Sequence, residues 1–220
     1  MPAASKKAIL AELQRLYPDA KPELNFSNPY ETLVATILSA QCTDKQVNKV
    51  TPAVFARFPD ATSMAAASVE ELYPMVKSCG FKTKASNIIE ACKIIALKHG
   101  GEVPKTMEEL TALPGVGRKT ANVVMANAFG TPAIAVDTHV FRVSNRLGLA
   151  DAEDVLKTEL QLQKAIPKSD WSAAHHWLIY HGRRVCKAQR PLCESCTLRE
   201  MCKARRQKKK TAKAAKAVEA

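Results

Sequence analysis

The chain has 220 residues, of which 46% are hydrophobic and 25% charged, and its formal net charge is +12. This composition is that of a globular protein, and the basic balance favours a polyanionic partner such as nucleic acid. Because the sequence contains no apolar run long enough to span a bilayer and no secretory signal near its start, we expect a cytoplasmic protein without a membrane partner.

The expected elements are helices, and hardly any strand pattern is present. The first helical pattern runs from Lys6 to Tyr17, and the second begins at Asn28-Pro29-Tyr30-Glu31, a capping box with proline at the first helical position. Capping residues and glycines separate the helical patterns that follow: Thr43 or Asp44 to Phe58, Ser68 to Gly80, Lys82 to His99, Thr106 to Leu113, Arg118 to Phe129, Asp137 to Leu147, Asp151 to Ala165 and Ser169 to Arg184.

The stretch from Leu113 to Val124 joins two of these helices into a helix–hairpin–helix. Its turn, Pro114-Gly115-Val116-Gly117, lets the backbone bend sharply or approach a ligand closely. Free amides at the start of a helix form an anion site, and phosphate is the anion expected for a basic protein. Lys119 lies in the first helical turn beside Arg118, where the helix dipole disfavours a cation, and a neutral lysine amine is a nucleophile. The alternative interpretation is a glycine turn that caps two helices, with Lys119 as a solvated charge.

Seven cysteines in a chain without an export signal do not indicate a disulfide framework. Four of them lie within seventeen residues and follow the pattern C-x6-C-x2-C-x5-C: Cys186, Cys193, Cys196 and Cys202. The close C-x2-C pair lets two thiolates reach one centre, so this pattern predicts a metal site. Zinc and an iron–sulfur cluster both accept four thiolates, and the wide first and last gaps favour the larger cluster.

Three features occur together: the hairpin with Lys119, the segment Val136-Asp137-Thr138-His139-Val140 eighteen residues after that lysine, and the cysteine pattern. In this combination the chain resembles the endonuclease III family, the bifunctional DNA glycosylases and AP lyases of base-excision repair. The resemblance extends from about Lys6 to Cys202 and includes Leu38-Ser39-Ala40-Gln41-Cys42-Thr43-Asp44 and Tyr180-His181-Gly182-Arg183. The cysteine spacing together with the lysine-bearing hairpin is highly specific, whereas a helix–hairpin–helix alone is not.

The resemblance implies an all-α, two-lobed fold with a C-terminal iron–sulfur cluster loop. One lobe, residues 22–130, would contain six helices including the helix–hairpin–helix. The other would combine residues 1–21 with residues 131–202 and hold a [4Fe–4S] cluster on the four cysteines of the loop 186–202. The basic tail, residues 203–220, has little to bury, and we expect it to be disordered.

The resemblance also implies which residues carry out the reaction. Lys119 matches the family's Schiff-base lysine, and Asp137 matches its catalytic aspartate. An aspartate at this place is also an ordinary N-cap.

The residues expected to contact DNA lie in several separate segments of the sequence. Gln41 matches the glutamine that fills the gap left by a flipped nucleotide, although a polar residue at a helix end needs no such role. Phe81 stands where the family has an aliphatic wedge, often leucine, and the alternative for Phe81 is a place in the core. His139 is expected to be structural or a phosphate contact. The hairpin is expected to hold phosphate through Gly115, Gly117 and Arg118.

The implied activity is a DNA N-glycosylase that removes oxidised or otherwise damaged pyrimidines from double-stranded DNA. An associated AP lyase would cut the strand 3′ to the abasic site by β-elimination. The partner would be damaged duplex DNA, bound by a monomer associated with the nucleoid. One alternative is an adenine-mismatch glycosylase of the MutY type, but those usually lack the lysine. The other is a non-catalytic iron–sulfur DNA-binding protein, against which Lys119 and Asp137 argue.

Overall fold

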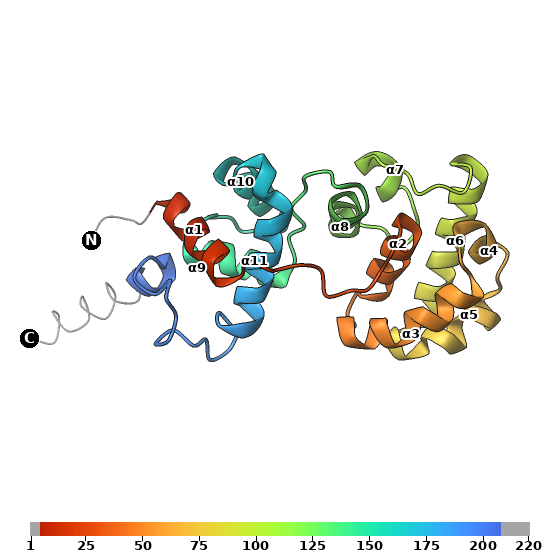
Figure 1. The fold of residues 1–220 in the computed structure, drawn as a ribbon, viewed down its shortest axis with the longest axis horizontal. Helices are drawn as coiled ribbons and strands as arrows, with labels where there is room; N and C mark the ends of the chain where they lie inside the picture. The colour runs from red at the N-terminus through yellow and green to blue at the C-terminus, as the bar shows by residue number, and fades with distance from the viewer. Residues whose placement is uncertain (1–4, 208–220) are drawn as a thin grey trace, which may run out of the picture. The chain divides into compact units, whose positions relative to one another are not determined.

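The structure is a computed structural model that describes residues 5–207. Every regular element in this range is a helix, and no strand occurs in it (Figure 1). The all-α fold class expected from the sequence is therefore confirmed. The chain divides into two compact units, one formed by Pro22–Ala133 and the other by Met1–Lys21 with Ile134–Ala220. None of the described helices is long and apolar enough to cross a bilayer.

The unit Pro22–Ala133 contains seven α-helices and one turn of 3-10 helix, where the sequence had predicted six helices. They are α2 (Pro29–Leu38), α3 (Asp44–Arg57), α4 (Ala61–Ala65), α5 (Val69–Val76), η1 (Lys77–Cys79), α6 (Lys82–Lys98), α7 (Met107–Thr111) and α8 (Arg118–Phe129). The additional helix, α4, is only five residues long, so it has no apolar period that a sequence pattern could reveal. A capping box between Asp60 and Ser63 begins it.

The core of this unit is built around α2. Eight of the ten residues of α2 are buried, because helices pack against it on several sides, among them α8, α3 and α6. Leu33 and Leu38 are fully buried, and each such side chain contributes about 1.5–3 kcal/mol of transfer free energy. The buried hydroxyl of Tyr30 donates to the carbonyl of Phe58 at 2.8 Å, which joins the start of α2 to the end of α3.

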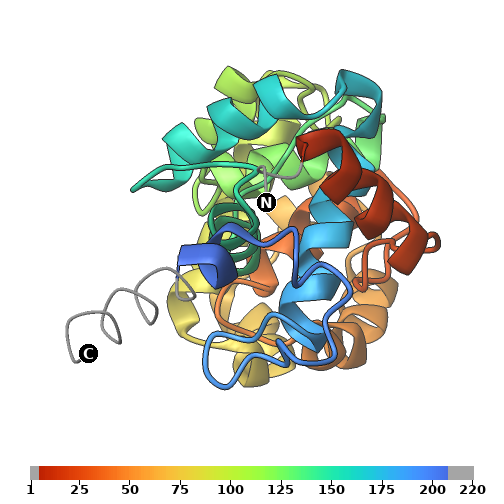
Figure 2. The ribbon, with the colours of Figure 1, turned by 90° about the vertical axis from the view of Figure 1, so that its left-hand side faces the viewer.

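Apart from the short helical segment 203–207, the described residues of the second unit form four α-helices and one turn of 3-10 helix. They are α1 (Lys6–Leu16), α9 (Thr138–Leu147), α10 (Val155–Ala165), η2 (Lys168–Asp170) and α11 (Trp171–Arg184). Both α1 and α9 pack against α11, and Leu13, Val140 and Leu178 are fully buried between them. Figure 2 shows α1, in red, beside the light-blue α11, although the two helices are far apart in the sequence.

The first residues of the basic tail are ordered, whereas the sequence analysis expected the whole tail to be disordered. Residues 203–207 are helical, and the Lys203 ammonium lies 2.7 Å from a carboxylate oxygen of Asp151. Arg205 pairs with Glu194 at 3.1 Å. Composition alone indicated a solvated tail, because it does not show that acidic partners outside the tail lie within reach of these side chains. Residues 208–220, the rest of the predicted tail, lie outside the described residues.

Candidate functional site

The hairpin turn between α7 and α8 is held by its own backbone and by one obligatory glycine. The Val116 amide donates to the carbonyl of Leu113 at 3.1 Å, and both side chains are buried. Gly115 has a φ of +77°, a left-handed conformation that favours glycine. A Cβ at this position would lie 3.0 Å from the Cβ of Asn87, so a larger residue would also crowd that side chain.

Among the described residues, the start of α8 faces an open surface and has no side-chain cap. Gly117 is the N-cap residue of this helix. A Cβ added to Gly117 would meet no atom within 4 Å, so the space above the first turn is open. Uncapped amides at the positive end of a helix attract anions. Arg118 and Lys119, the first two residues of α8, are both exposed beside these amides.

Asp137 begins α9 in the other unit. Its Oδ1 accepts the backbone amide of Val140 at 2.7 Å, so the carboxylate is the N-cap of the helix, and it is half-buried. The preceding residues, 133–136, are buried and carry the chain into α9. Lys119 therefore lies in the first turn of a helix of the unit Pro22–Ala133. Asp137 lies at the N-cap of a helix of the other unit.

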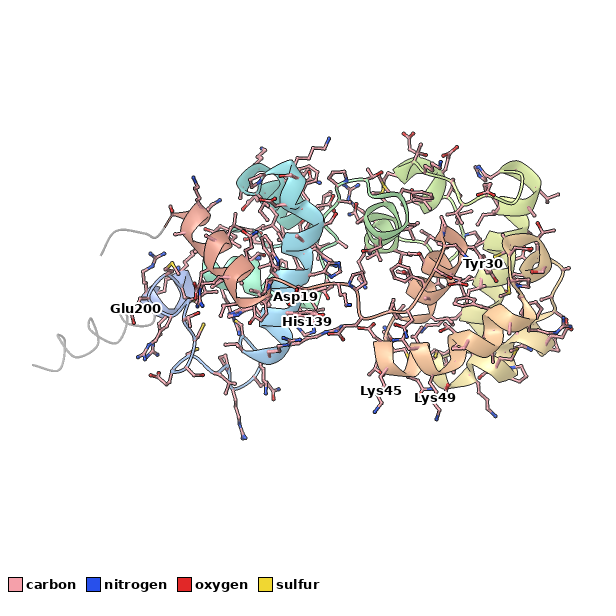
Figure 3. All side chains as sticks on the ribbon, in the orientation of Figure 1. Asp19, Tyr30, Lys45, Lys49, His139 and Glu200 are labelled. Atoms are coloured by element: carbon pink, nitrogen blue, oxygen red, sulfur yellow. The ribbon has the colours of Figure 1, made fainter. Side chains whose placement is uncertain are left out.

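His139 is the second residue of α9 and packs against α11 (Figure 3). A Cβ on Gly182 would lie 3.0 Å from both the Cβ and the Nδ1 of His139, so this contact depends on glycine. Arg142 Nη2 lies 3.1 Å from His139 Nδ1, and since a guanidinium only donates, Nδ1 accepts. The same arginine donates to the carbonyls of Gly182 and Cys186, each at 3.1 Å. Sequence reasoning missed Arg142, because these two carbonyls lie 40 and 44 residues away.

The four cysteines of the C-x6-C-x2-C-x5-C pattern line one cavity. Its volume is about 340 Å³, part of which is open solvent, and Leu147, Val185 and Leu192 add apolar walls. The four thiols are all half-buried: Cys186, Cys193, Cys196 and Cys202. Burial raises the pKa of the Cys196 thiol, and the charges of the other three thiols raise it further, so the four groups interact. No set of three His, Cys, Asp or Glu side chains among the described residues is grouped for a single metal ion.

Residues of α9 and α11 form hydrogen bonds with the cysteine loop around this cavity. Arg146 of α9 donates to the Cys186 sulfur at 3.6 Å and to the carbonyl of Lys187 at 2.8 Å. The Cys202 thiol donates to the carbonyl of Arg146 at 3.2 Å. On α11, His181 Nε2 lies 3.8 Å from the Cys196 sulfur and its Nδ1 lies 3.0 Å from the hydroxyl of Tyr17. Burial lowers the pKa of His181 to about 4, so the ring is neutral at pH 7.

Gln41 and Phe81 occupy two exposed turns of the unit Pro22–Ala133. Gln41 lies between α2 and α3 with a φ of +57°, an uncommon conformation for a residue other than glycine. Phe81 is the N-cap of α6, and 81% of its side chain is exposed. The structure therefore excludes the alternative in which Phe81 belongs to the core. Lys45 and Lys49 project outward from α3, the helix that follows Gln41 (Figure 3).

Comparison with known proteins identifies the family. The HhH-GPD superfamily of base excision DNA repair proteins matches residues 34–168. The chain is 52% identical to endonuclease III of Synechocystis sp. over 205 residues, which cover 90% of this chain and 94% of that protein.

Two solved structures are also similar to this chain. One is a trapped endonuclease III–DNA covalent intermediate in an estranged-adenine complex, with 48% identity and a TM-score of 0.87 over 93% of this chain and 99% of that one. The other is a non-covalent endonuclease III–DNA complex, with 47% identity and a TM-score of 0.88 over 94% and 99%. These similarities confirm the resemblance seen in the sequence, and the chain belongs to the endonuclease III family of the HhH-GPD superfamily.

Proposed function

We propose that this chain performs the endonuclease III reaction, DNA N-glycosylase with associated AP lyase, using Lys119 as its nucleophile. Membership of the family supports the activity, and oxidised or otherwise damaged pyrimidines in double-stranded DNA are the proposed substrates. The observation that carries the assignment of Lys119 is its place in the exposed first turn of α8, directly after the uncapped amides of the hairpin. A phosphate bound by those amides brings its sugar close to the lysine amine.

The proposed chemistry begins with a base that has been flipped out of the duplex. Lys119 Nζ attacks C1′ of the sugar, the N-glycosidic bond breaks, and the damaged base leaves. The amine loses a proton, the bond between C1′ and the ring oxygen O4′ breaks with protonation of O4′, and a Schiff base forms between Nζ and C1′ of the opened sugar. Loss of a proton from C2′ then breaks the bond between C3′ and its oxygen, which cuts the strand on the 3′ side.

We assign Asp137 to stabilising the cationic sugar in the transition state and to assisting proton transfer. Its Oδ1 is occupied by the Val140 amide, which fixes the orientation of the carboxylate and leaves Oδ2 for the substrate. A carboxylate held in this way adds electrostatic stabilisation without having to reorganise during the reaction.

We infer that Cys186, Cys193, Cys196 and Cys202 hold a [4Fe–4S] cluster. Four half-buried thiols around one cavity with apolar walls suit a cubane, in which each thiolate binds a different iron. Arg146 donates to the Cys186 sulfur, as donors outside the metal's own ligands do in such centres. The cluster, when bound, would supply structure and DNA docking and would take no part in the chemical step.

DNA would be bound by a monomer, in association with the nucleoid of the cytoplasm. The hairpin amides and Arg118 are the proposed phosphate contacts, with His139 as a further contact. Gln41 and Phe81 would fill the space left by the extruded nucleotide. The exposure of Phe81 supports this role, because an aromatic ring in water is available to stack between bases.

The test is borohydride trapping on a panel of duplexes that each carry one defined lesion. We expect base release, strand cutting and a covalent adduct on duplexes with damaged pyrimidines, and none of these on an undamaged duplex. Release of adenine from mismatches without an adduct would instead support the MutY-type alternative. Lys119→Ala is the control that separates the adduct from adventitious amines.

A further inference from the structure

The side chain of Lys84 joins the two exposed turns that carry Gln41 and Phe81. Its ammonium donates to the carbonyl of Leu38 at 2.9 Å and to that of Cys79 at 2.6 Å, and it also donates to the carbonyl of Ala40. An ammonium group has three protons to donate, so these three bonds use its full capacity.

The three carbonyls belong to the ends of two different helices. Leu38 is the last residue of α2 and Ala40 lies two residues beyond it, while Cys79 is the last residue of η1. Carbonyls at the end of a helix have no partner within that helix and carry its negative partial charge. The ammonium of Lys84 satisfies both helix ends at once.

Gln41 directly follows Ala40, and Phe81 lies two residues after Cys79. The Lys84 bonds are therefore made at the base of each turn. The side chains at the two tips, Gln41 and Phe81, are exposed. Cys42, the neighbour of Gln41, packs against the core and contacts the thiol of the buried Cys79, so the bases of the turns also have one direct contact.

Two further contacts tighten the same arrangement. Gly80 has a φ of +135°, and a Cβ there would lie 3.2 Å from the Nζ of Lys84, so the glycine lets the turn close over the ammonium. Gln46 Nε2 donates to the Ser78 hydroxyl at 2.7 Å, which ties the first turn of α3 to η1. The second contact fixes the spacing of the two segments but reaches neither tip.

We propose that Lys84 is a positioning residue for base extrusion, holding the turns of Gln41 and Phe81 at a fixed separation. This inference rests on the proposed function, in which those two side chains fill the gap in the duplex. Unstacking a base costs a few kcal/mol, and side chains recover that cost only if their turns are already ordered. Without the three bonds, part of this ordering would have to take place when DNA binds.

The test compares Lys84→Met with the matched control Lys82→Met. Lys82 lies in the first turn of the same helix, is exposed, and pairs with Glu70 at 3.0 Å, so its removal takes away the same charge but no bond to either turn. We expect Lys84→Met to lower single-turnover base release from a paired lesion about tenfold, and to leave release from a single-stranded or mismatched lesion within about twofold. Lys82→Met should change the rate of base release from the two kinds of substrate by the same factor.

A double-mutant cycle gives the second readout. If Lys84 acts through the two turns, Lys84→Met should lower base release from a paired lesion only slightly further in a protein that already carries Gln41→Ala and Phe81→Ala. Equal effects of Lys84→Met on paired and single-stranded lesions, or additive effects in the cycle, would overturn the inference. Circular dichroism melts check that each variant is folded, and if Lys84→Met is not, Lys84→Arg is measured in the same way. Wild-type protein that forms no borohydride adduct on any duplex would instead contradict the proposed function.

Discussion

Asp137 Oδ1 accepts the backbone amide of Val140 at 2.7 Å, so the carboxylate proposed for catalysis is also the N-cap of α9. One oxygen stabilises the helix, and the other is the oxygen that we propose acts on the sugar. Structural and catalytic contributions of this residue can therefore be separated, because asparagine caps a helix as well as aspartate does whereas alanine does not.

Replacement of Asp137 by asparagine should leave the free energy of unfolding within about 0.5 kcal/mol of wild type, while alanine should lower it by about 1 kcal/mol. Both variants should release damaged bases much more slowly, because both remove the negative charge that stabilises the cationic sugar. Urea denaturation and single-turnover base release measure the two effects. Asp137→Asn should still allow some trapping on a pre-formed abasic site, and full base release by this variant would contradict the assignment.

Replacement of Lys119 by alanine or glutamine should abolish both borohydride trapping and strand cutting. Lys119 is exposed, so either change should alter the free energy of unfolding by no more than about 0.5 kcal/mol. Most of the DNA affinity should also remain, since the hairpin amides and Arg118 are unchanged. A Lys119→Ala protein that still forms the adduct would show that a different amine is the nucleophile.

The cysteine cavity predicts a brown protein with about four irons per chain when it is purified without oxygen. Arg146→Met should release the cluster more readily, because it removes the donors to the Cys186 sulfur and to the Lys187 carbonyl. Visible absorbance and iron content during exposure to a chelator measure this loss, with Arg57→Met as a control on a surface arginine of the other unit, which pairs with Glu71. Stoichiometric zinc without iron would contradict the cluster.

The lowered pKa of His176 predicts that the folded protein loses stability in mild acid. Burial lowers the pKa of this histidine to about 3, with His175 and Arg183 adding to the effect, whereas an unfolded chain has a value near 6.5. The folded state therefore favours the neutral ring, and this contribution is present above pH 6.5 and is lost as the pH falls towards 3.

The measurement compares wild type with His176→Gln by urea denaturation at pH 7 and pH 5. Since His176 is half-buried, we expect wild type to lose about 1 kcal/mol more than the variant between these two values. Equal losses in the two proteins would mean that His176 is no more protonated in the unfolded chain than in the folded one.

Local patterns predicted most of the helices, because caps such as Asn28 and Ser68 act within three residues of themselves and are visible in the sequence. The contacts that connect distant segments were missed. Lys84 bonds to carbonyls 44 and 46 residues away, and Arg142 to carbonyls 40 and 44 residues away. An arginine or lysine inside a helical pattern gives no sign of such partners, since the same residue on a solvated face produces the same pattern.

The contact between the basic tail and Asp151 was also missed by the sequence analysis. This contact determines where a truncation of the tail should begin. Lys203 pairs with Asp151 at 2.7 Å, next to the cysteine loop, so a deletion that starts at Lys203 would remove a structural contact together with the tail charges. A deletion of residues 208–220 removes five lysines and keeps that ion pair.

We expect this shorter deletion to weaken binding to damaged and undamaged duplexes by the same factor, because lysine–phosphate contacts carry no information about the base. The slope of log affinity against log salt should fall by roughly 0.9 for each phosphate contact that is lost. Fluorescence anisotropy with both duplexes over a range of salt concentrations measures the factor and the slope. If the deletion removed the preference for damaged DNA, the tail would have to contact the lesion itself, and its assignment to non-specific binding alone would be wrong.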